Sequence, residues 1–178
     1  QGIIIAPVRE LAYQIAEVLR NIGQYLNVKP VVCVGKDNIH DARRNLNKGT
    51  SIVIGTPGRI IDMIERGYLS TRLLKILIMD EADEMLSRSF LPQIKKIIQE
   101  VPTDTQICIF SATMPYEALD ITKHFLVDPV EILVKQEDLT LDGISQFHID
   151  VGQERWKFET FCDLYDIVSI SQSMVYVN

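Results

Sequence analysis

The sequence has few of the residues that build metal centres or disulfide frameworks. Its 178 residues include three cysteines and three histidines, all far apart, and no Cys-x-x-Cys pair. No two candidate ligands have the spacing of a zinc site, and three isolated cysteines favour reduced thiols in an intracellular protein. No apolar run approaches the roughly 18 residues of a membrane span, so no membrane partner is expected.

A glycine-rich loop that cradles phosphates is also absent from the 178 residues. That loop needs a glycine five residues before its Gly-Lys and a serine or threonine after the lysine. The sequence Gly35-Lys36 instead has Pro30 and Asp37 at these positions. This absence is the largest gap in any ATPase interpretation of the sequence.

Charge is unevenly distributed along the chain. Residues 1–72 contain ten Lys and Arg against six Asp and Glu, whereas residues 73–178 contain eight against 18. The net charge of −6 argues against nucleic-acid binding by bulk charge. The basic first part could still contact phosphates locally.

Short apolar runs alternate with helical patterns. Nearly continuous apolar runs, typical of parallel strands buried on both faces, occur at Gly2–Ala6, Val31–Gly35, Ile52–Gly55, Ile76–Asp80, Gln106–Phe110 and Glu131–Val134. Apolar residues at helical spacing predict helices at Leu11–Leu26, Asp37–Leu46, Arg59–Arg66, Leu91–Glu100 and Tyr116–Phe125. This alternation predicts an α/β domain with a doubly wound parallel sheet.

A change of composition predicts a domain boundary. Residues 1–134 form the expected first domain, and the polar, glycine-terminated stretch 135–143 is typical of a linker. Residues 144–178 then predict strand, helix and strand at Ile144–Val151, Glu154–Val168 and Ser173–Asn178, the start of a second α/β domain. Because strand patterns lie at both termini, we expect the sequence to be an excerpt of a longer chain.

An acidic turn follows the fourth predicted strand. Asp80, Glu81 and Asp83 come directly after Ile76–Met79, where open α/β sheets bind ligands. Asp80 suits Mg²⁺ held through water, and Glu81 suits the orientation of a water that attacks a phosphate. The alternative is an acidic helix N-terminus favoured by the helix dipole.

Two hydroxyl residues follow the next strand. Ser111 and Thr113 should lie at the same sheet edge as the acidic turn, where they could bond Asp83. The alternative, favoured for these residues alone, is a helix N-cap before Pro115.

The basic part offers backbone N–H groups and cations at three strand ends. Thr56 fits an N-cap and Pro57 the first helical position, so the helix start that contains Gly58 and Arg59 could bind an anion. Pro7 and Arg9 follow the first strand similarly, and Gly35 follows the second. Together they predict a sequence-independent track for a sugar–phosphate backbone, although each one singly is better explained as a capped helix start.

The motifs PVREL, GK, TPGR, DEAD and SAT, in that order, resemble those of DEAD-box RNA helicases over essentially the whole chain. The stretches DEADEMLSRSF and SATMP resemble the 4A class of eukaryotic translation initiation factors and its exon-junction paralogue. The stretch RGYLS also favours the initiation factor, whereas WKF and CDLYD favour the paralogue. Three departures from the family pattern are Val8 for threonine, and Lys36 and Ser89 for glycines.

The resemblance implies two RecA-like domains that bind ATP and RNA between them. Asp80 would hold Mg²⁺, Glu81 would position the attacking water, and Asp83 would couple nucleotide state to strand separation through Ser111 and Thr113. The residues implied to touch the RNA backbone are Pro7, Arg9, Gly35, Thr56, Gly58 and Arg59. Because the glycine-rich loop is absent, the excerpt alone is expected to be unstable and inactive.

The leading hypothesis is therefore an ATP-dependent RNA helicase of translation initiation, expected to be a cytoplasmic monomer with a scaffold partner. The exon-junction paralogue would instead be nuclear, with exon-junction partners. A metal-dependent nuclease or phosphatase using Asp80 and Asp83 would need further carboxylates, which the other strand ends do not supply. A non-catalytic RNA clamp or partner-binding module is the remaining alternative, and Val8 and Lys36 give it some weight.

Overall fold

A computed structural model describes residues 1–26, 28–87, 89–133 and 143–177. The chain divides into two compact units, Gln1–Leu133 and Val134–Asn178, which are considered separately below. Residues 135–142 of the expected linker lie outside the described residues. The assignment of 1–134, 135–143 and 144–178 to a domain, a linker and a second domain stays a prediction.

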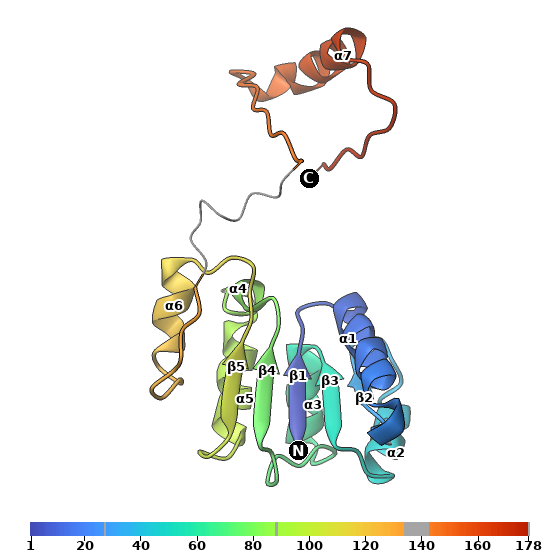
Figure 1. Ribbon diagram of the computed structural model, residues 1–178, viewed down its shortest axis with the longest axis vertical. Helices are drawn as coiled ribbons and strands as arrows, with labels where there is room; N and C mark the ends of the chain where they lie inside the picture. The colour runs from blue at the N-terminus through green and yellow to red at the C-terminus, as the bar shows by residue number, and fades with distance from the viewer. Residues whose placement is uncertain (27, 88, 134–142, 178) are drawn as a thin grey trace. The chain divides into compact units, whose positions relative to one another are not determined.

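The first unit is built on a five-stranded parallel sheet of order β2-β3-β1-β4-β5 (Figure 1). The strands are β1 (Gly2–Ile5), β2 (Val31–Cys33), β3 (Ile52–Gly55), β4 (Ile76–Met79) and β5 (Gln106–Ile109). The first strand in the sequence lies at the centre, paired with β3 on one side and β4 on the other. The predicted α/β class and its parallel sheet are confirmed.

Helices follow the strands in the predicted order. They are α1 (Arg9–Ile22), α2 (Ile39–Asn47), α3 (Pro57–Glu65), α4 (Ala82–Met85), α5 (Leu91–Glu100) and α6 (Tyr116–Thr122), with a 3₁₀ turn η1 at Gln24–Leu26. All five predicted helices of this unit are present, and the four-residue α4 is an addition to them.

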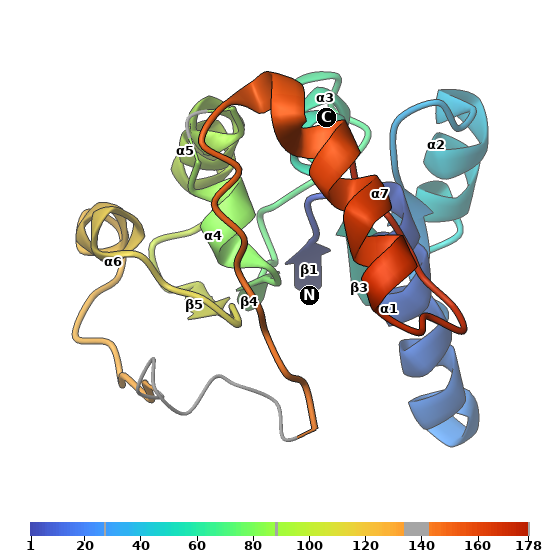
Figure 2. The same cartoon turned by 90° about the horizontal axis from the view of Figure 1, so that it is seen from above.

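Alternate residues of the central strand enter two separate cores, as the period of a strand requires. Ile3 and Ile5 belong to the larger core, to which α3 and α5 contribute, whereas Ile4 packs with Ala12 and Ala16 of α1. Figure 2 shows α1 on one face of the sheet and α3 and α5 on the other. The near-continuous apolar runs are thus explained by burial on both faces.

Three of the strand predictions are wrong for the residues that the structure describes. No strand forms at 131–133, 144–151 or 173–177, and the side chains of Ile132, Phe147 and Tyr176 are 86–90% exposed. A strand needs a neighbour to accept its backbone hydrogen bonds, and these segments have no partner strand among the described residues. The apolar, β-branched composition of these segments predicted strands, but the segments do not pair with another strand.

In the described residues of the second unit, η3 (Glu154–Trp156) is followed by α7 (Lys157–Ile167). This confirms the predicted helix at Glu154–Val168. The rings of Phe161 and Tyr165, one turn apart, meet edge to face with centroids 5.0 Å apart. Among the helices that the structure describes, none combines the length and apolar character that crossing a membrane requires.

Candidate functional site

The predicted site residues lie in the turns that follow the five strands or in the first turn of the next helix. Because the strands are parallel, these turns share one edge of the sheet, at the carboxyl ends of the strands (Figure 1). The order of the strands in the sheet also separates the basic turns from the acidic and hydroxyl-bearing turns. The basic turns follow β2, β3 and β1, which are neighbours, and the acidic and hydroxyl turns follow β4 and β5, which are also neighbours.

The acidic turn is fixed by backbone hydrogen bonds to the strands on both sides. The N–H of Asp80 donates to the carbonyl of Ile5 at 3.0 Å, and the N–H of Ala82 donates to the carbonyl of Phe110 at 3.0 Å. Between them, Glu81 has φ +53°, a left-handed conformation that is uncommon for a residue with a β-carbon. This conformation turns the chain from β4 into α4 and leaves Glu81 exposed.

Asp83 connects the acidic turn to the turn after β5. The Ser111 hydroxyl donates to Asp83 Oδ1 at 2.7 Å, and the Thr113 hydroxyl donates to Oδ2. These bonds, above all the one from Thr113, hold the pKa of Asp83 below its ordinary value, although partial burial opposes the shift. Asp83 is therefore an ionised carboxylate with both oxygens occupied.

The hydroxyls do not cap the next helix. The N-cap of α6 is Pro115, and it has no side-chain hydrogen bond. The alternative interpretation of Ser111 and Thr113 as a helix cap is thus contradicted, because their hydroxyls bond Asp83 instead.

The carboxylates of Asp80 and Glu81 remain available to a ligand. Asp80 is partly exposed, and its Oδ1 accepts a hydrogen bond from the Glu81 N–H at 3.1 Å. No cluster of three or more His, Cys, Asp or Glu side chains that could hold a metal occurs in the described residues. The arrangement fits a cation held by Asp80 through water rather than a cation enclosed by protein ligands.

On the basic side, two of the three turns open helices as predicted. Thr56 is the extended N-cap of α3 with Pro57 in the first turn, and Val8 is the extended N-cap of α1. Neither makes a side-chain capping bond, so the first N–H groups of these helices are not capped by them. A β-carbon added to Gly58 would meet nothing within 4 Å, which leaves the backbone of this helix start open to close approach.

The third turn differs from its prediction. Gly35 and Lys36 do not begin a helix; α2 starts at Ile39, where Asn38 caps it by accepting a hydrogen bond from the His40 N–H at 2.9 Å. Lys36 has φ +65°, which a right-handed helix cannot contain. The expected helix start at Asp37 is therefore two residues too early.

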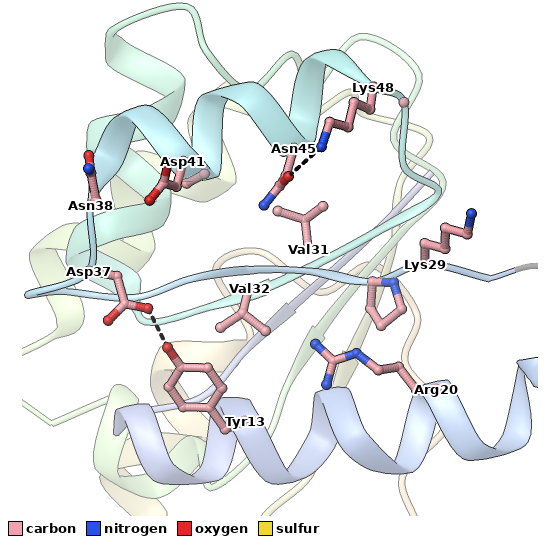
Figure 3. A pocket seen from close by; sticks show the side chains of 13 residues that line it. Tyr13, Arg20, Lys29, Val31, Val32, Asp37, Asn38, Asp41, Asn45 and Lys48 are labelled. Atoms are coloured by element: carbon pink, nitrogen blue, oxygen red, sulfur yellow. Dashed lines mark hydrogen bonds between the residues drawn. The ribbon is translucent and has the colours of Figure 1, made fainter.

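Arg9 and Arg59 both bind this turn. Arg9 donates to the Gly35 carbonyl at 2.5 Å and to Asp37 Oδ1 at 2.9 Å, and Arg59 donates twice to the Asp37 carbonyl at 3.2 Å. The Tyr13 hydroxyl donates to the other carboxylate oxygen of Asp37, across a groove of about 670 Å³ between α1 and α2 (Figure 3). That bond raises the pKa of Tyr13.

Sequence reasoning missed the roles of Asp37 and Tyr13. From the sequence, Asp37 is a departure from the glycine-loop pattern and the first residue of a predicted helix, and Tyr13 lies within an ordinary amphipathic helix. The two residues are 24 positions apart, so no local spacing signals their contact.

Cys33 ends β2 beside these turns and has no exposed surface. Burial raises the pKa of its thiol to about 11, although the charge of Arg59 partly opposes this. A buried thiol with a raised pKa is unreactive near neutral pH. The expectation that the cysteines are mostly buried holds for Cys33, whereas Cys108 is partly exposed and Cys162 is exposed.

Comparison with known proteins gives consistent matches. The DEAD/DEAH box helicase model matches residues 1–121. The chain is 51% identical over all 178 residues to eukaryotic initiation factor 4A-8 of Nicotiana tabacum and 47% identical to eukaryotic initiation factor 4A of Caenorhabditis elegans, and it covers 43% and 44% of those proteins. It thus spans less than half the length of these curated relatives.

A solved structure also resembles this one. The crystal structure of a hypothetical ATP-dependent RNA helicase from Sulfolobus tokodaii matches with a TM-score of 0.66 and 31% identity, over 71% of this chain and 38% of that one. A parallel sheet flanked by helices, together with this neighbour, identifies the fold of the first unit as RecA-like, as the sequence resemblance implied.

Proposed function

This chain belongs to the DEAD/DEAH box helicase family, and from that premise we propose that the complete protein couples ATP binding and hydrolysis to RNA duplex unwinding. The observation that carries the proposal is the bonding of Asp83 to Ser111 and Thr113. It joins the turn that would face the nucleotide to a neighbouring turn. Displacement of one turn then changes the position of the other, which is what coupling requires.

Each carboxylate of the acidic turn has its own role. Asp80 would hold Mg²⁺ of the bound nucleotide through water, and that ion would neutralise charge on the phosphates. Glu81, exposed beside it, would orient or activate the attacking water. Asp83 is assigned the coupling role instead, because both of its oxygens accept hydrogen bonds from the turn after β5.

The RNA backbone would lie along the basic turns. We assign the contacts to Pro7, Arg9, Gly35, Thr56, Gly58 and Arg59, which follow three neighbouring strands. Uncapped helix N–H groups and cations bind phosphates without reading bases. Recognition at this surface would therefore be independent of RNA sequence.

The similarity to initiation factors supports a role in translation initiation. We propose a cytoplasmic protein that acts as a monomer with a scaffold partner. The exon-junction paralogue, which would be nuclear, is the alternative within the family. A two-metal nuclease is disfavoured, since Asp83 is committed to hydroxyl groups and the described residues supply no further converging carboxylates.

The test is RNA-stimulated phosphate release by the complete gene product, compared with its Glu81→Gln variant. The variant keeps the size of the side chain but removes the carboxylate, so we expect hydrolysis to fall by about 10²-fold or more, with RNA binding retained. If the wild-type protein binds RNA in the presence of ATP without releasing phosphate, the proposal of an enzyme is contradicted and the non-catalytic RNA clamp is favoured. The 178 residues alone are expected to release none, because they contain no glycine-rich phosphate loop.

A further inference from the structure

Lys36 has an unusual backbone for a lysine. It lies in the turn between β2 and α2 with φ +65°, a conformation that is routine for glycine and disfavoured for side chains with a β-carbon. Its neighbour Gly35 is not held in this region. The chain therefore places its lysine, rather than its glycine, at the strained position of the turn.

Side chains of α1 and α3 bind the rest of the turn by hydrogen bonds. Arg9 and Arg59 bind the carbonyls of Gly35 and Asp37. Arg9 also binds one oxygen of the Asp37 carboxylate, and Tyr13 binds the other (Figure 3). The carbonyl and carboxylate acceptors on either side of Lys36 are thus already satisfied. Such a turn can impose a strained conformation on the residue at its tip.

These contacts change which cation is available to a ligand. Arg9 and Arg59 direct guanidinium N–H groups at the turn itself, and part of their charge is offset by Asp37. Lys36 is exposed and, in the part of the chain that the structure describes, its ammonium group makes no hydrogen bond or ion pair. It follows β2 at the edge of the sheet, next to the end of β3, where the uncapped N–H groups of α3 would bind phosphates.

We propose that Lys36 binds a phosphate of the RNA backbone, on a turn that Arg9, Arg59 and Asp37 hold in place. A glycine at position 36 would offer only its backbone N–H to a phosphate, whereas the lysine side chain adds an ammonium group. The inference rests on the proposed function, because it takes RNA as the ligand. It assigns Arg9 and Arg59 a positioning role in addition to any direct contact.

The test compares Lys36→Gln with wild type in the complete protein, by fluorescence anisotropy of a labelled single-stranded RNA at several salt concentrations. Loss of one phosphate contact should reduce the slope of log K against log salt by about 0.7. If the contact is purely electrostatic and vanishes near 1 M salt, affinity should fall about eightfold at 50 mM and about threefold at 200 mM. Lys36→Arg should retain most of the binding.

Two further variants separate charge from backbone strain. Lys36→Gly should lose the same RNA affinity but unfold at a higher temperature than wild type, because glycine adopts the left-handed conformation without strain. Lys48→Gln removes the same charge at the far end of the groove from Asp37 (Figure 3) and should change neither the affinity nor the salt slope.

The outcomes distinguish this inference from the function on which it rests. Wild-type protein that binds no RNA would overturn both. Wild type that binds RNA while Lys36→Gln matches its affinity and salt slope would overturn the role of Lys36 alone. An equal loss in Lys48→Gln would also overturn it, since the effect would then reflect total charge.

Discussion

The carboxylate of Asp83 is held by hydroxyl groups from a different strand end, and this has a consequence for pH. Its folded-state pKa is lowered chiefly by the hydrogen bond from Thr113. A carboxyl group with a lowered folded-state pKa stabilises the fold above the unfolded-state pKa, which is about 3.9 for aspartate. That contribution is lost as the pH falls through the folded-state value.

We therefore expect Asp83→Asn to be destabilised relative to wild type most strongly near pH 6. The difference in free energy of unfolding should shrink as the pH falls below about 4. Denaturant unfolding of the complete protein at a series of pH values measures it. Thr113→Val should weaken the same pH dependence, since it removes the bond that lowers the pKa most; a difference that grows in acid would contradict the argument.

Single residues were predictable where their chemistry is local. The position of Asp80 and Glu81 after a buried strand, and of Thr56 and Pro57 at a helix start, follows from adjacent sequence. The contacts of Arg9 with Gly35 and Asp37 join residues 26 and 28 positions apart. Such contacts depend on β1 and β2 being placed in one sheet, with β3 between them, which no pattern around Arg9 could indicate.

Among the strands, β3 depends on a glycine for its packing. A β-carbon added to Gly55 would lie 2.2 Å from the Cys33 carbonyl oxygen and 2.8 Å from Ile60 Cδ1. The first of these atoms is backbone of the neighbouring strand β2, so it cannot move aside without disturbing the pairing. Gly55 thus permits β2, β3 and α3 to approach closely.

Gly55→Ala should destabilise the protein by about 1–3 kcal/mol, as overpacking of a core does. Gly58→Ala is the matched control, because its β-carbon would meet nothing within 4 Å and alanine is the better helix former. Thermal unfolding of the two variants in the complete protein distinguishes them. Equal stability of both variants would show that the close contact at Gly55 relaxes without cost.

Elements were predicted well where burial on two faces leaves a clear pattern. The five strands of the sheet and the helix at Leu91–Glu100 were correct from apolar runs and spacing alone. Helix starts were less predictable, since Asn38, rather than any apolar residue, determines where α2 begins. The wrong strands at 131–133, 144–151 and 173–177 show that composition alone does not supply a pairing partner.

On the scale of the whole molecule, the link between Asp83, Ser111 and Thr113 should separate hydrolysis from unwinding. We expect Ser111→Ala combined with Thr113→Val to retain RNA-stimulated phosphate release but to lose duplex separation at least about tenfold. Hydrogen bonds to a charged group contribute about 1.5–3 kcal/mol each, which sets that lower limit.

Parallel assays of phosphate release and of strand separation on a labelled duplex measure the two activities of that variant. Val8→Thr serves as a control on the RNA side, since it restores a hydroxyl to the first basic turn without touching Asp83. If the double variant loses both activities in proportion, the hydroxyls maintain the acidic turn rather than couple it to RNA.

The central position of β1 also affects how the protein is synthesised. Ile3 pairs with Val53 and with Leu77, so its two neighbours are translated 50 and 74 residues later. At about 5–20 residues per second, these delays last roughly 2.5–10 and 4–15 seconds. During that time the isoleucines of β1 cannot pair with β3 and β4, the two strands that flank β1 in the sheet. Until β3 is synthesised, the unpaired edges of β1 are a site at which nascent chains can aggregate.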